Sequence, residues 1–206
     1  MKKYDMIIKI KKGNRGIILM GKRLKEYINP KMGKTRMITY MGLLIALDVV
    51  LTRTLSITTP GWRIGFGFVA TSVTGYLFGP IWAAIGAALA DVVGFYTPLN
   101  TAPYAYFYGY TISAALRGVA YGVLLYKCKG SNISAVIKCI VGASVVFVLL
   151  DLGLNGYWGI TLTPQPYWTW FIANIGPISG NFAIRCIIMP VYILFMKRNY
   201  QAIFGR

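Results

Sequence analysis

The sequence predicts an all-α membrane protein with six transmembrane helices and both termini in the cytoplasm. Three observations predict this fold class: 56% of the 206 residues are hydrophobic, only 13% are charged, and the apolar residues gather in six stretches. A soluble domain normally carries about a quarter charged residues, and a soluble fold of this length could not bury so much apolar surface. We therefore expect a bilayer, rather than water, to surround most of the chain.

The expected spans form one membrane domain, residues 37–206, which follows a basic N-terminal extension, residues 1–36. A helix of about 20 residues crosses the hydrocarbon layer. The second and third spans are shorter than that, so we expect them to form a tight helical hairpin around Gly79 and Pro80. The six spans comprise residues 37–55, 64–78, 81–96, 106–126, 133–154 and 177–196.

The placement of charge orients these spans. Twelve of the 22 Lys and Arg residues precede the first span, and 18 of the 22 fall on segments at one side of the membrane. Basic residues accumulate on the cytoplasmic side, so we expect the extension, the connection at Lys127 and the C-terminus to face the cytoplasm. The net charge of +17 therefore fits a multi-pass protein of the cell membrane and not a nucleic-acid-binding protein.

The connections expected on the outer side are rich in aromatic, proline and amide residues. They comprise residues 56–63, 97–105 and 155–176 and contain four of the five Trp residues. An aromatic belt at the headgroups of a bilayer would explain this composition. A lid over a pocket for a flat, polar ring would also explain it, and we favour the pocket because so many aromatic residues lie on one side.

Ionisable residues within the spans indicate a polar interior, because charges in a membrane usually face the middle of a helix bundle. One interpretation is that Asp48, Asp151 and Arg185 neutralise one another in ion pairs. Another is that Arg53 and Arg63, which flank the first outer connection, bind an anionic ligand through their planar guanidinium groups. The full set comprises Asp48, Arg53, Arg63, Asp91, Arg117, Asp151 and Arg185.

The residues needed for common enzyme chemistry are missing from the sequence. It has no His, its three Cys residues show no C-x-x-C spacing, and the fragment Gly33-Lys34-Thr35 lacks the upstream glycine of a phosphate-binding loop because that position is Ile28. We therefore expect no enzyme activity, no metal site, and no cofactor or ATP hydrolysis in this chain. The cysteines are expected to be small buried thiols.

Small residues are spaced four apart in the first span, at Gly42 and Ala46. This spacing lets helix backbones approach closely. The pair therefore serves either packing within the bundle or the docking of a partner membrane protein.

Motifs of a known family occur in five segments: A-L-D-V-V-L-T-R-T-L-S-I (46–57), R-I-G-F-G-F (63–68), L-F-G-P (77–80), L-A-D-V-V-G (89–94) and Y-T-I-S-A-A-L-R-G-V-A-Y-G (110–122). With these segments the chain resembles the substrate-binding S components of energy-coupling factor (ECF) vitamin transporters, and among them most the folate-specific group. The resemblance implies capture of a vitamin and its uptake by toppling of the protein in the membrane. It also implies a transmembrane scaffold subunit, docked on Gly42 and Ala46, and two ATPase subunits as partners.

Folate fits the expected pocket because it combines a flat pterin ring with a glutamate tail that carries two carboxylates. We expect Arg53 and Arg63 to bind these carboxylates. Two alternatives stay open: an S component for another heterocycle, such as a queuosine precursor, and a membrane interaction protein without a ligand. The remaining residues expected at the ligand are Trp62, Tyr108, Tyr157, Trp158 and Trp168 around the rings, and Asp91, Asn155 and Asn174 for polar contacts.

Overall fold

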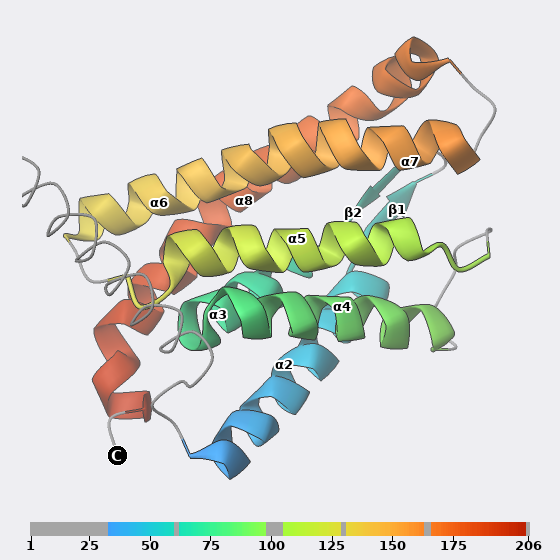
Figure 1. Ribbon diagram of the computed structural model, residues 1–206. Helices are drawn as coiled ribbons and strands as arrows, with labels where there is room; N and C mark the ends of the chain where they lie inside the picture. The colour runs from blue at the N-terminus through green and yellow to red at the C-terminus, as the bar shows by residue number, and fades with distance from the viewer. Residues whose placement is uncertain (1–32, 60–61, 98–104, 129–130, 163–165, 205–206) are drawn as a thin grey trace, which may run out of the picture.

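A computed structural model describes residues 33–59, 62–97, 105–128, 131–162 and 166–204 of the chain. Most of the predicted N-terminal extension, residues 1–32, lies outside these ranges. Along the chain (Figure 1) the elements are α2 (Lys34–Arg53), β1 (Ile57–Thr59), β2 (Trp62–Ile64), α3 (Phe68–Phe78), α4 (Pro80–Tyr96), α5 (Tyr108–Leu125), α6 (Asn132–Val145), the π-helical segment η1 (Val146–Leu154), α7 (Asn155–Leu162) and α8 (Tyr167–Phe204).

The predicted helical and apolar character of the fold is confirmed. The two shorter apolar helices α3 and α4 form the tight hairpin expected at Gly79 and Pro80. Gly79 has a φ of 87°, a conformation that glycine adopts without strain, and Pro80 begins α4, where its missing N–H is not needed. The helical stretches that are long and apolar enough to cross a bilayer are Thr35–Arg53, Asn132–Leu162 and Tyr167–Asn199.

Two segments that were expected to be loops contain regular structure. Residues 57–59 and 62–64 pair as a short antiparallel hairpin with Ile57 opposite Ile64, in keeping with the β-branched residues there. Within residues 155–176, the structure places α7 and the first turns of α8. A side chain on Gly156 or Gly159 would collide with the indole ring of Trp170, so these glycines allow the two helices to pack closely where a loop was expected.

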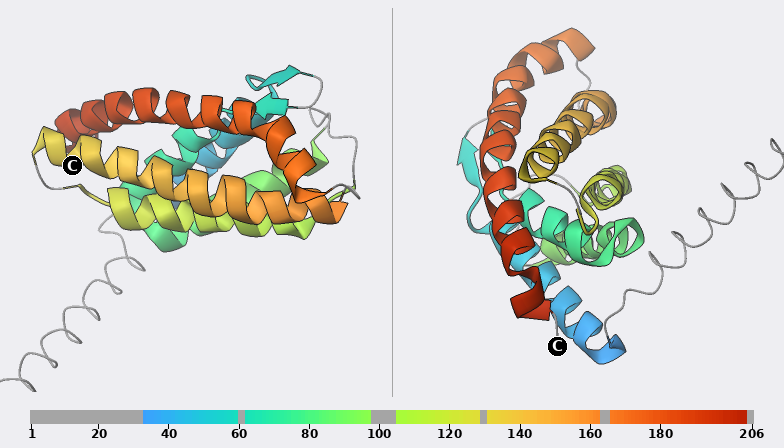
Figure 2. Two further views of the ribbon diagram at one scale, coloured as in Figure 1. Left: turned by 90° about the horizontal axis from the view of Figure 1, so that it is seen from above. Right: turned by 90° about the vertical axis from the view of Figure 1, so that its left-hand side faces the viewer.

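The bundle is organised around α3. This helix contacts α2, α4, α5 and α8, while α6 lies between α5 and α8 (Figures 1 and 2). Nine of the eleven residues of α3 are buried, so it is the central helix. At about 1.5 Å per residue, eleven residues are too short to run through the whole bundle, and α3 fills one end only.

The two ends of the bundle therefore differ. The end that carries β1, β2 and α7 is termed the hairpin end, and the end filled by α3 is termed the core end. The free thiols of Cys128 and Cys139 are buried and that of Cys186 is partly buried, which confirms the prediction for the first two. The large side chains that are fully buried at the core end include Phe78, Tyr121, Leu125, Met189 and Ile193.

Glycines let α3, α4 and α5 approach closely at the core end. A methyl group on Gly75 would lie 2.9 Å from the backbone nitrogen of Gly122, and one on Gly122 would overlap the backbone of Pro80. A methyl group on Gly118 would overlap the carbonyl of Ala83 in the same way. Because backbone atoms cannot move aside as flexible side chains do, the three helices depend on these glycines for their spacing.

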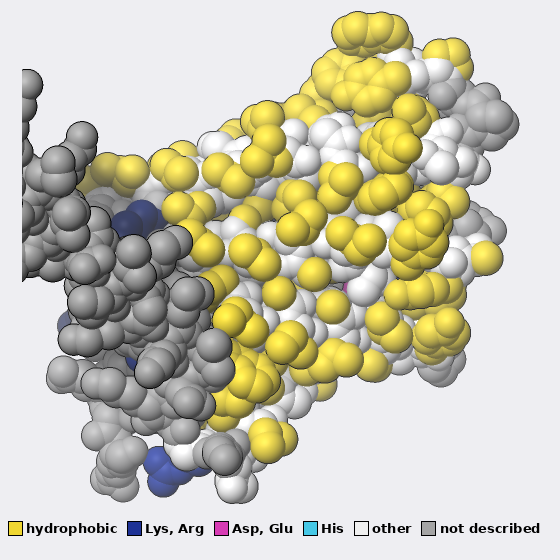
Figure 3. Space-filling view, in the orientation of Figure 1, with side chains coloured by type: hydrophobic (Ala, Val, Ile, Leu, Met, Phe, Trp, Pro, Cys, Tyr) yellow, Lys and Arg dark blue, Asp and Glu magenta, His cyan; other side chains and the backbone are white. Residues whose placement is uncertain are grey.

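The outer surface of the bundle is mostly hydrophobic. Large apolar side chains are exposed on several helices, among them Leu43, Leu89, Ile133 and Ile187, as expected for helices that face lipid. In Figure 3 the Lys and Arg side chains gather toward the core end, and apolar side chains cover most of the face beside them.

Replacing Gly122 by Ala should destabilise the protein by roughly 1–3 kcal/mol, because the added methyl group would overlap the Pro80 backbone. Thermal unfolding of the detergent-purified protein measures this as a lower Tm. Gly42→Ala is the matched control, since nothing lies within 4 Å of a methyl group there, and its Tm should stay the same or rise slightly. Equal Tm values for both variants would contradict the close packing of α3, α4 and α5.

Candidate ligand-binding cavity

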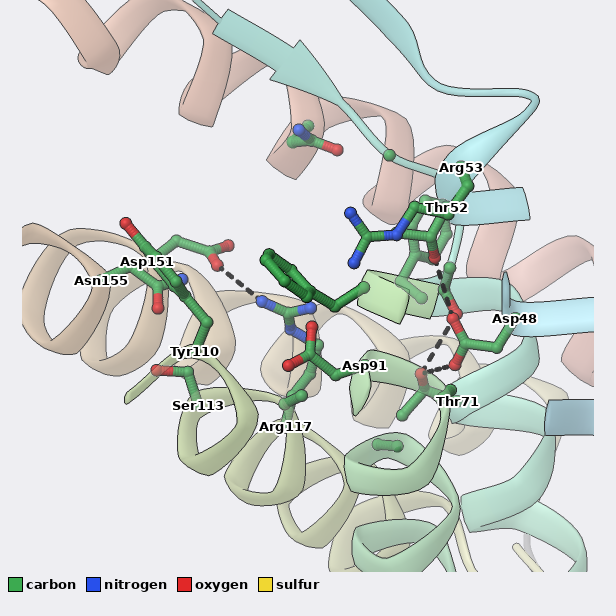
Figure 4. Close-up of a pocket in the computed structure, with 18 of the residues that line it drawn as sticks. Asp48, Thr52, Arg53, Thr71, Asp91, Tyr110, Ser113, Arg117, Asp151 and Asn155 are labelled. Carbon is green, nitrogen blue, oxygen red and sulfur yellow. Dashed lines mark hydrogen bonds and ion pairs between the residues drawn. The ribbon is translucent and has the colours of Figure 1, made fainter. Parts of the chain in front are cut away.

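A cavity of about 420 Å³ lies at the hairpin end of the bundle, where α3 begins at Phe68. Its volume falls within the range of small-molecule sites, about 300 to 1,000 Å³. Three carboxylates and three guanidinium groups line it among the described residues, so their formal charges cancel. These residues, most of them labelled in Figure 4, are Asp48, Arg53, Asp91, Arg117, Asp151 and Arg185.

Asp151 forms ion pairs with two arginines. Its Oδ2 lies 2.5 Å from Nη1 of Arg185 and its Oδ1 lies 3.4 Å from Nη2 of Arg117. Asp151 is 7% exposed and Arg185 is 5% exposed, and the guanidinium of Arg185 lies 5.8 Å from the ring centre of Phe68. The predicted ion pair between Asp151 and Arg185 is confirmed. Together the three charged groups join α5, η1 and α8 in the wall of the cavity.

Asp48 is held by threonines instead of by an arginine. Its Oδ1 accepts a hydrogen bond of 3.0 Å from Thr52, and its Oδ2 accepts one of 2.8 Å from Thr71 (Figure 4). Among the described residues Asp48 forms no ion pair, so the interpretation that it shares the pair of Asp151 and Arg185 is wrong. Its carboxylate lies at the N-terminus of α3, where backbone N–H groups favour negative charge. A side chain on Gly67 would overlap this carboxylate.

Asp91 belongs to a chain of hydrogen bonds that links α4 to α5. Thr111 donates to Oδ2 of Asp91 at 2.6 Å, and the hydroxyl of Tyr106 lies 2.6 Å from Oγ1 of Thr111. The ring of Tyr106 meets Phe95 edge to face, with ring centres 5.2 Å apart. Asp91 and Tyr106 both line the cavity, which places Asp91 where the sequence analysis expects a ligand.

Arg53 lines the cavity from the C-terminal end of α2. It lies against Gly94 of α4, where a side chain would begin 3.0 Å from Nε of Arg53. Glycine at this position therefore leaves the space that the guanidinium occupies. Trp62 and Arg63 belong to β2, and their side chains lie outside the described part of the structure.

Asn155 and Asn174 also line the cavity, as the sequence analysis expects. The amide nitrogen of Asn174 donates to the carbonyl of residue 170 at 2.8 Å. Among the buried polar atoms of the lining, Oδ1 of Asn155, Nε of Arg117 and Nε of Arg185 have no hydrogen-bond partner in the described part of the chain. Buried polar atoms are normally satisfied, so these atoms can serve a bound molecule as one acceptor and two donors.

The aromatic wall differs from the expected one. Tyr108, Tyr157 and Trp168 are 65%, 57% and 71% exposed and do not line the cavity. Trp158 lies behind the wall, where its indole N–H donates to Ser113 at 3.2 Å. The aromatic residues that do line the cavity are Phe68, Phe95, Tyr106, Phe107, Tyr110 and Trp170.

The spacing of residues along α5 and α8 explains why the aromatic lining differs from the expected one. The same spacing is visible in the sequence and could have indicated the correct residues. Residues 110, 114 and 117 line the cavity from α5, and their spacing of three or four places them on one helix face. Phe107 lines the cavity from the position just before α5, whereas Tyr108, the first residue of the helix, is exposed and lies outside the lining. Residues 170, 174, 178, 181 and 185 form an equivalent face on α8, which a search for polar and aromatic residues at this spacing would find.

Known proteins resemble the chain over most of its length. It is 35% identical over 158 residues to the folate transporter FolT of Clostridium novyi (strain NT), which covers 77% of this chain and 88% of that protein. It is 30% identical over 154 residues to the folate transporter FolT of Leuconostoc mesenteroides subsp. mesenteroides, covering 74% and 79%. A crystal structure of FolT bound with folic acid matches with a TM-score of 0.66 at 32% identity, covering 77% of this chain and 91% of that one. No protein-family model matches.

Replacing Asp151 by Asn should lower the stability of the protein by roughly 3–5 kcal/mol, because two neighbouring guanidinium groups lose the charge that they share. The Tm of the purified protein measures this loss. Asp48→Asn is the matched control: the hydroxyls of Thr52 and Thr71 can still bond to an amide, so its Tm should change little. A similar fall in Tm in both variants would show that the ion pairs of Asp151 do not stabilise the protein more than the hydrogen bonds of Asp48 do.

Proposed function

The chain belongs to the FolT family of folate transporters, and we propose from this membership that it binds folate and takes part in its uptake as the S component of an ECF transporter. The role is transport and not enzyme catalysis. The observation that carries the proposal is the cavity at the hairpin end, in which guanidinium, carboxylate and aromatic groups lie together in a chain related to FolT.

We further propose that the chain crosses the cell membrane six times, through α2, α3 together with the β2 segment that precedes it, α4, α5, the continuous α6–η1 helix, and α8. The core end then faces the cytoplasm and the hairpin end faces outward. The basic residues of the described chain support this orientation, because Arg36, Lys127, Lys138, Lys197 and Arg198 all lie toward the core end. Residues 1–36 form a cytoplasmic extension in this topology, and residues 37–206 form the substrate-binding domain.

The pterin ring of folate is proposed to lie among the aromatic side chains of the cavity, with its N–H groups toward Asp91 and its acceptor atoms toward arginine N–H groups. A flat ring with donors and acceptors suits the buried polar atoms of Asn155, Arg117 and Arg185. A ring also loses less hydration on burial than a carboxylate does. Asn174 supplies a further polar side chain in the same wall.

The glutamate tail is proposed to lie toward the hairpin, where Arg53 and Arg63 bind its carboxylates. The lining charges of the described residues already cancel, and both oxygens of Asp151 are engaged by arginines. Two further negative charges at that depth would need additional cations, because buried charges are stable only when paired. Trp62 and Arg63 belong to β2, which pairs with β1 in the hairpin that follows α2, so their backbone lies at this end of the bundle.

Uptake is proposed to require a transmembrane scaffold subunit and two ATPase subunits, with the whole S component toppling in the membrane. Gly42 and Ala46 are exposed on α2, and nothing in the described chain lies within 4 Å of a methyl group on Gly42. The pair is therefore not used for packing within the bundle. It leaves a shallow site at which another helix can approach closely.

Mass spectrometry of small molecules retained by the detergent-purified protein tests the proposed function, with titration calorimetry against folic acid as the second measurement. We expect folate to co-purify and to bind. Retention of a different heterocycle, with no heat of binding from folic acid, would refute folate as the ligand. Retention of nothing, with no binding in the titration, would refute the binding function itself.

Arg53→Ala should weaken folate binding by tenfold or more, because a hydrogen bond to a charged group contributes about 1.5–3 kcal/mol. Arg36→Ala, at the start of α2 and far from the cavity, is the matched control and should bind as the unmodified protein does. Calorimetry measures both Kd values. Unchanged binding in Arg53→Ala would remove Arg53 from the site and favour a ligand without carboxylates.

Ala46→Leu should abolish folate uptake and co-purification with the scaffold subunit while leaving folate binding unchanged, because the larger side chain keeps the partner helix away. Ala183→Leu makes the same change at another exposed alanine, on α8, and should retain uptake. Pull-down of the assembled complex and uptake into cells give the two measurements. Equal uptake in both variants would contradict docking on α2.

A further inference from the structure

The three carboxylates of the cavity differ in how many of their oxygens are already engaged. Both oxygens of Asp48 accept hydrogen bonds from threonines, and both oxygens of Asp151 face arginines. Asp91 has one oxygen, Oδ2, bonded to Thr111. Its Oδ1 accepts no hydrogen bond from any residue that the structure describes. Asp91 is therefore the carboxylate with an oxygen left for a ligand, and it lines the cavity.

Thr111 controls how this carboxylate is held. It comes from α5, is not part of the cavity lining, and donates a hydrogen bond to Oδ2 of Asp91 at 2.6 Å. A carboxylate can only accept hydrogen bonds, and a threonine hydroxyl has a single proton. The hydroxyl proton of Thr111 must therefore form the hydrogen bond to Asp91.

Tyr106 then has only one possible role in the chain. Its hydroxyl lies 2.6 Å from Oγ1 of Thr111, and because the proton of Thr111 is already donated, Tyr106 must donate to Thr111. Both contacts thus run in one direction, from Tyr106 through Thr111 to Asp91. A donor that itself accepts a hydrogen bond is polarised and becomes stronger, so Tyr106 strengthens the bond that holds Oδ2 of Asp91.

Resting on the proposed function, we propose that Thr111 is a positioning residue for folate selectivity: with Tyr106 it aims Oδ1 of Asp91 at the neighbouring N–H donors of the pterin, its 2-amino group and N3–H. A ring with these donors satisfies Oδ1. A ring without the amino donor leaves a desolvated carboxylate oxygen poorly paired, which weakens binding. Selectivity for the amino edge of the ring is thereby set by a residue that does not touch the ligand.

The test compares two probes, folic acid and 2-desamino-2-methylfolic acid, which lacks the amino donor. Calorimetry with the detergent-purified full chain measures both Kd values for each variant. The unmodified protein should prefer folic acid by tenfold or more. Thr111→Val keeps the shape of the side chain but removes its hydroxyl. It should weaken folic acid binding by about tenfold and change binding of the desamino probe by less than about twofold, so the preference disappears.

Two further variants separate positioning from general damage. Thr111→Ser keeps the hydroxyl and should restore the preference for folic acid. Tyr106→Phe removes only the first bond of the chain and should reduce the preference by about two- to fivefold. Thr39→Val is the matched control, because the hydroxyl of Thr39 bonds only to a backbone carbonyl on the exposed side of α2, and it should leave both Kd values unchanged.

Three results would overturn the role of Thr111. An equal loss of both probes in Thr111→Val would mean a structural role only, and unchanged binding of both would mean no role. Equal binding of both probes by the unmodified protein would mean that Asp91 does not accept a hydrogen bond from the 2-amino group, although folate is still the ligand. Binding of neither probe by the unmodified protein would instead refute the proposed function together with this selectivity.

Discussion

The carboxylate of Asp151, shared by two arginines, holds the hairpin end of the bundle together. In a membrane interior no bulk water weakens the repulsion between Arg117 and Arg185, so a negative group must lie between them. The π-helical segment that carries Asp151 supplies that group to both neighbours, at 2.5 and 3.4 Å. Through this shared carboxylate, α5 and α8 both contribute an arginine to the wall of the cavity.

Much of this arrangement could be predicted from the sequence, because its cause is local. Runs of apolar residues indicate helices, and Gly79-Pro80 indicates the turn between α3 and α4. The rule that buried charges need partners anticipates the pairing of Asp151 with Arg185. It also predicts that Arg53 and Asp91, which lie near the same end of their helices, face a shared interior, and both line the cavity.

The rest depends on packing between distant segments, which hydropathy does not encode. A membrane helix is apolar on its lipid side and on its core side, so composition does not tell whether Phe107 or Tyr108 faces inward. The region 155–176 looks like a loop because of its proline and amide residues. It is largely helical, and Gly156 and Gly159 let α7 pack against a ring of the next helix. Asp48 was expected to need an arginine, whereas threonines and a helix N-terminus satisfy it.

The cavity ends where the core begins. Phe78, Tyr121 and Leu125 are buried beneath it with no more than trace contact to solvent, so the described part of the chain holds a cup and not a pore. A solute that enters such a cup must leave by the same mouth unless the whole body is moved by other proteins. The described helices therefore offer an ion no continuous polar path from the cavity to the core end.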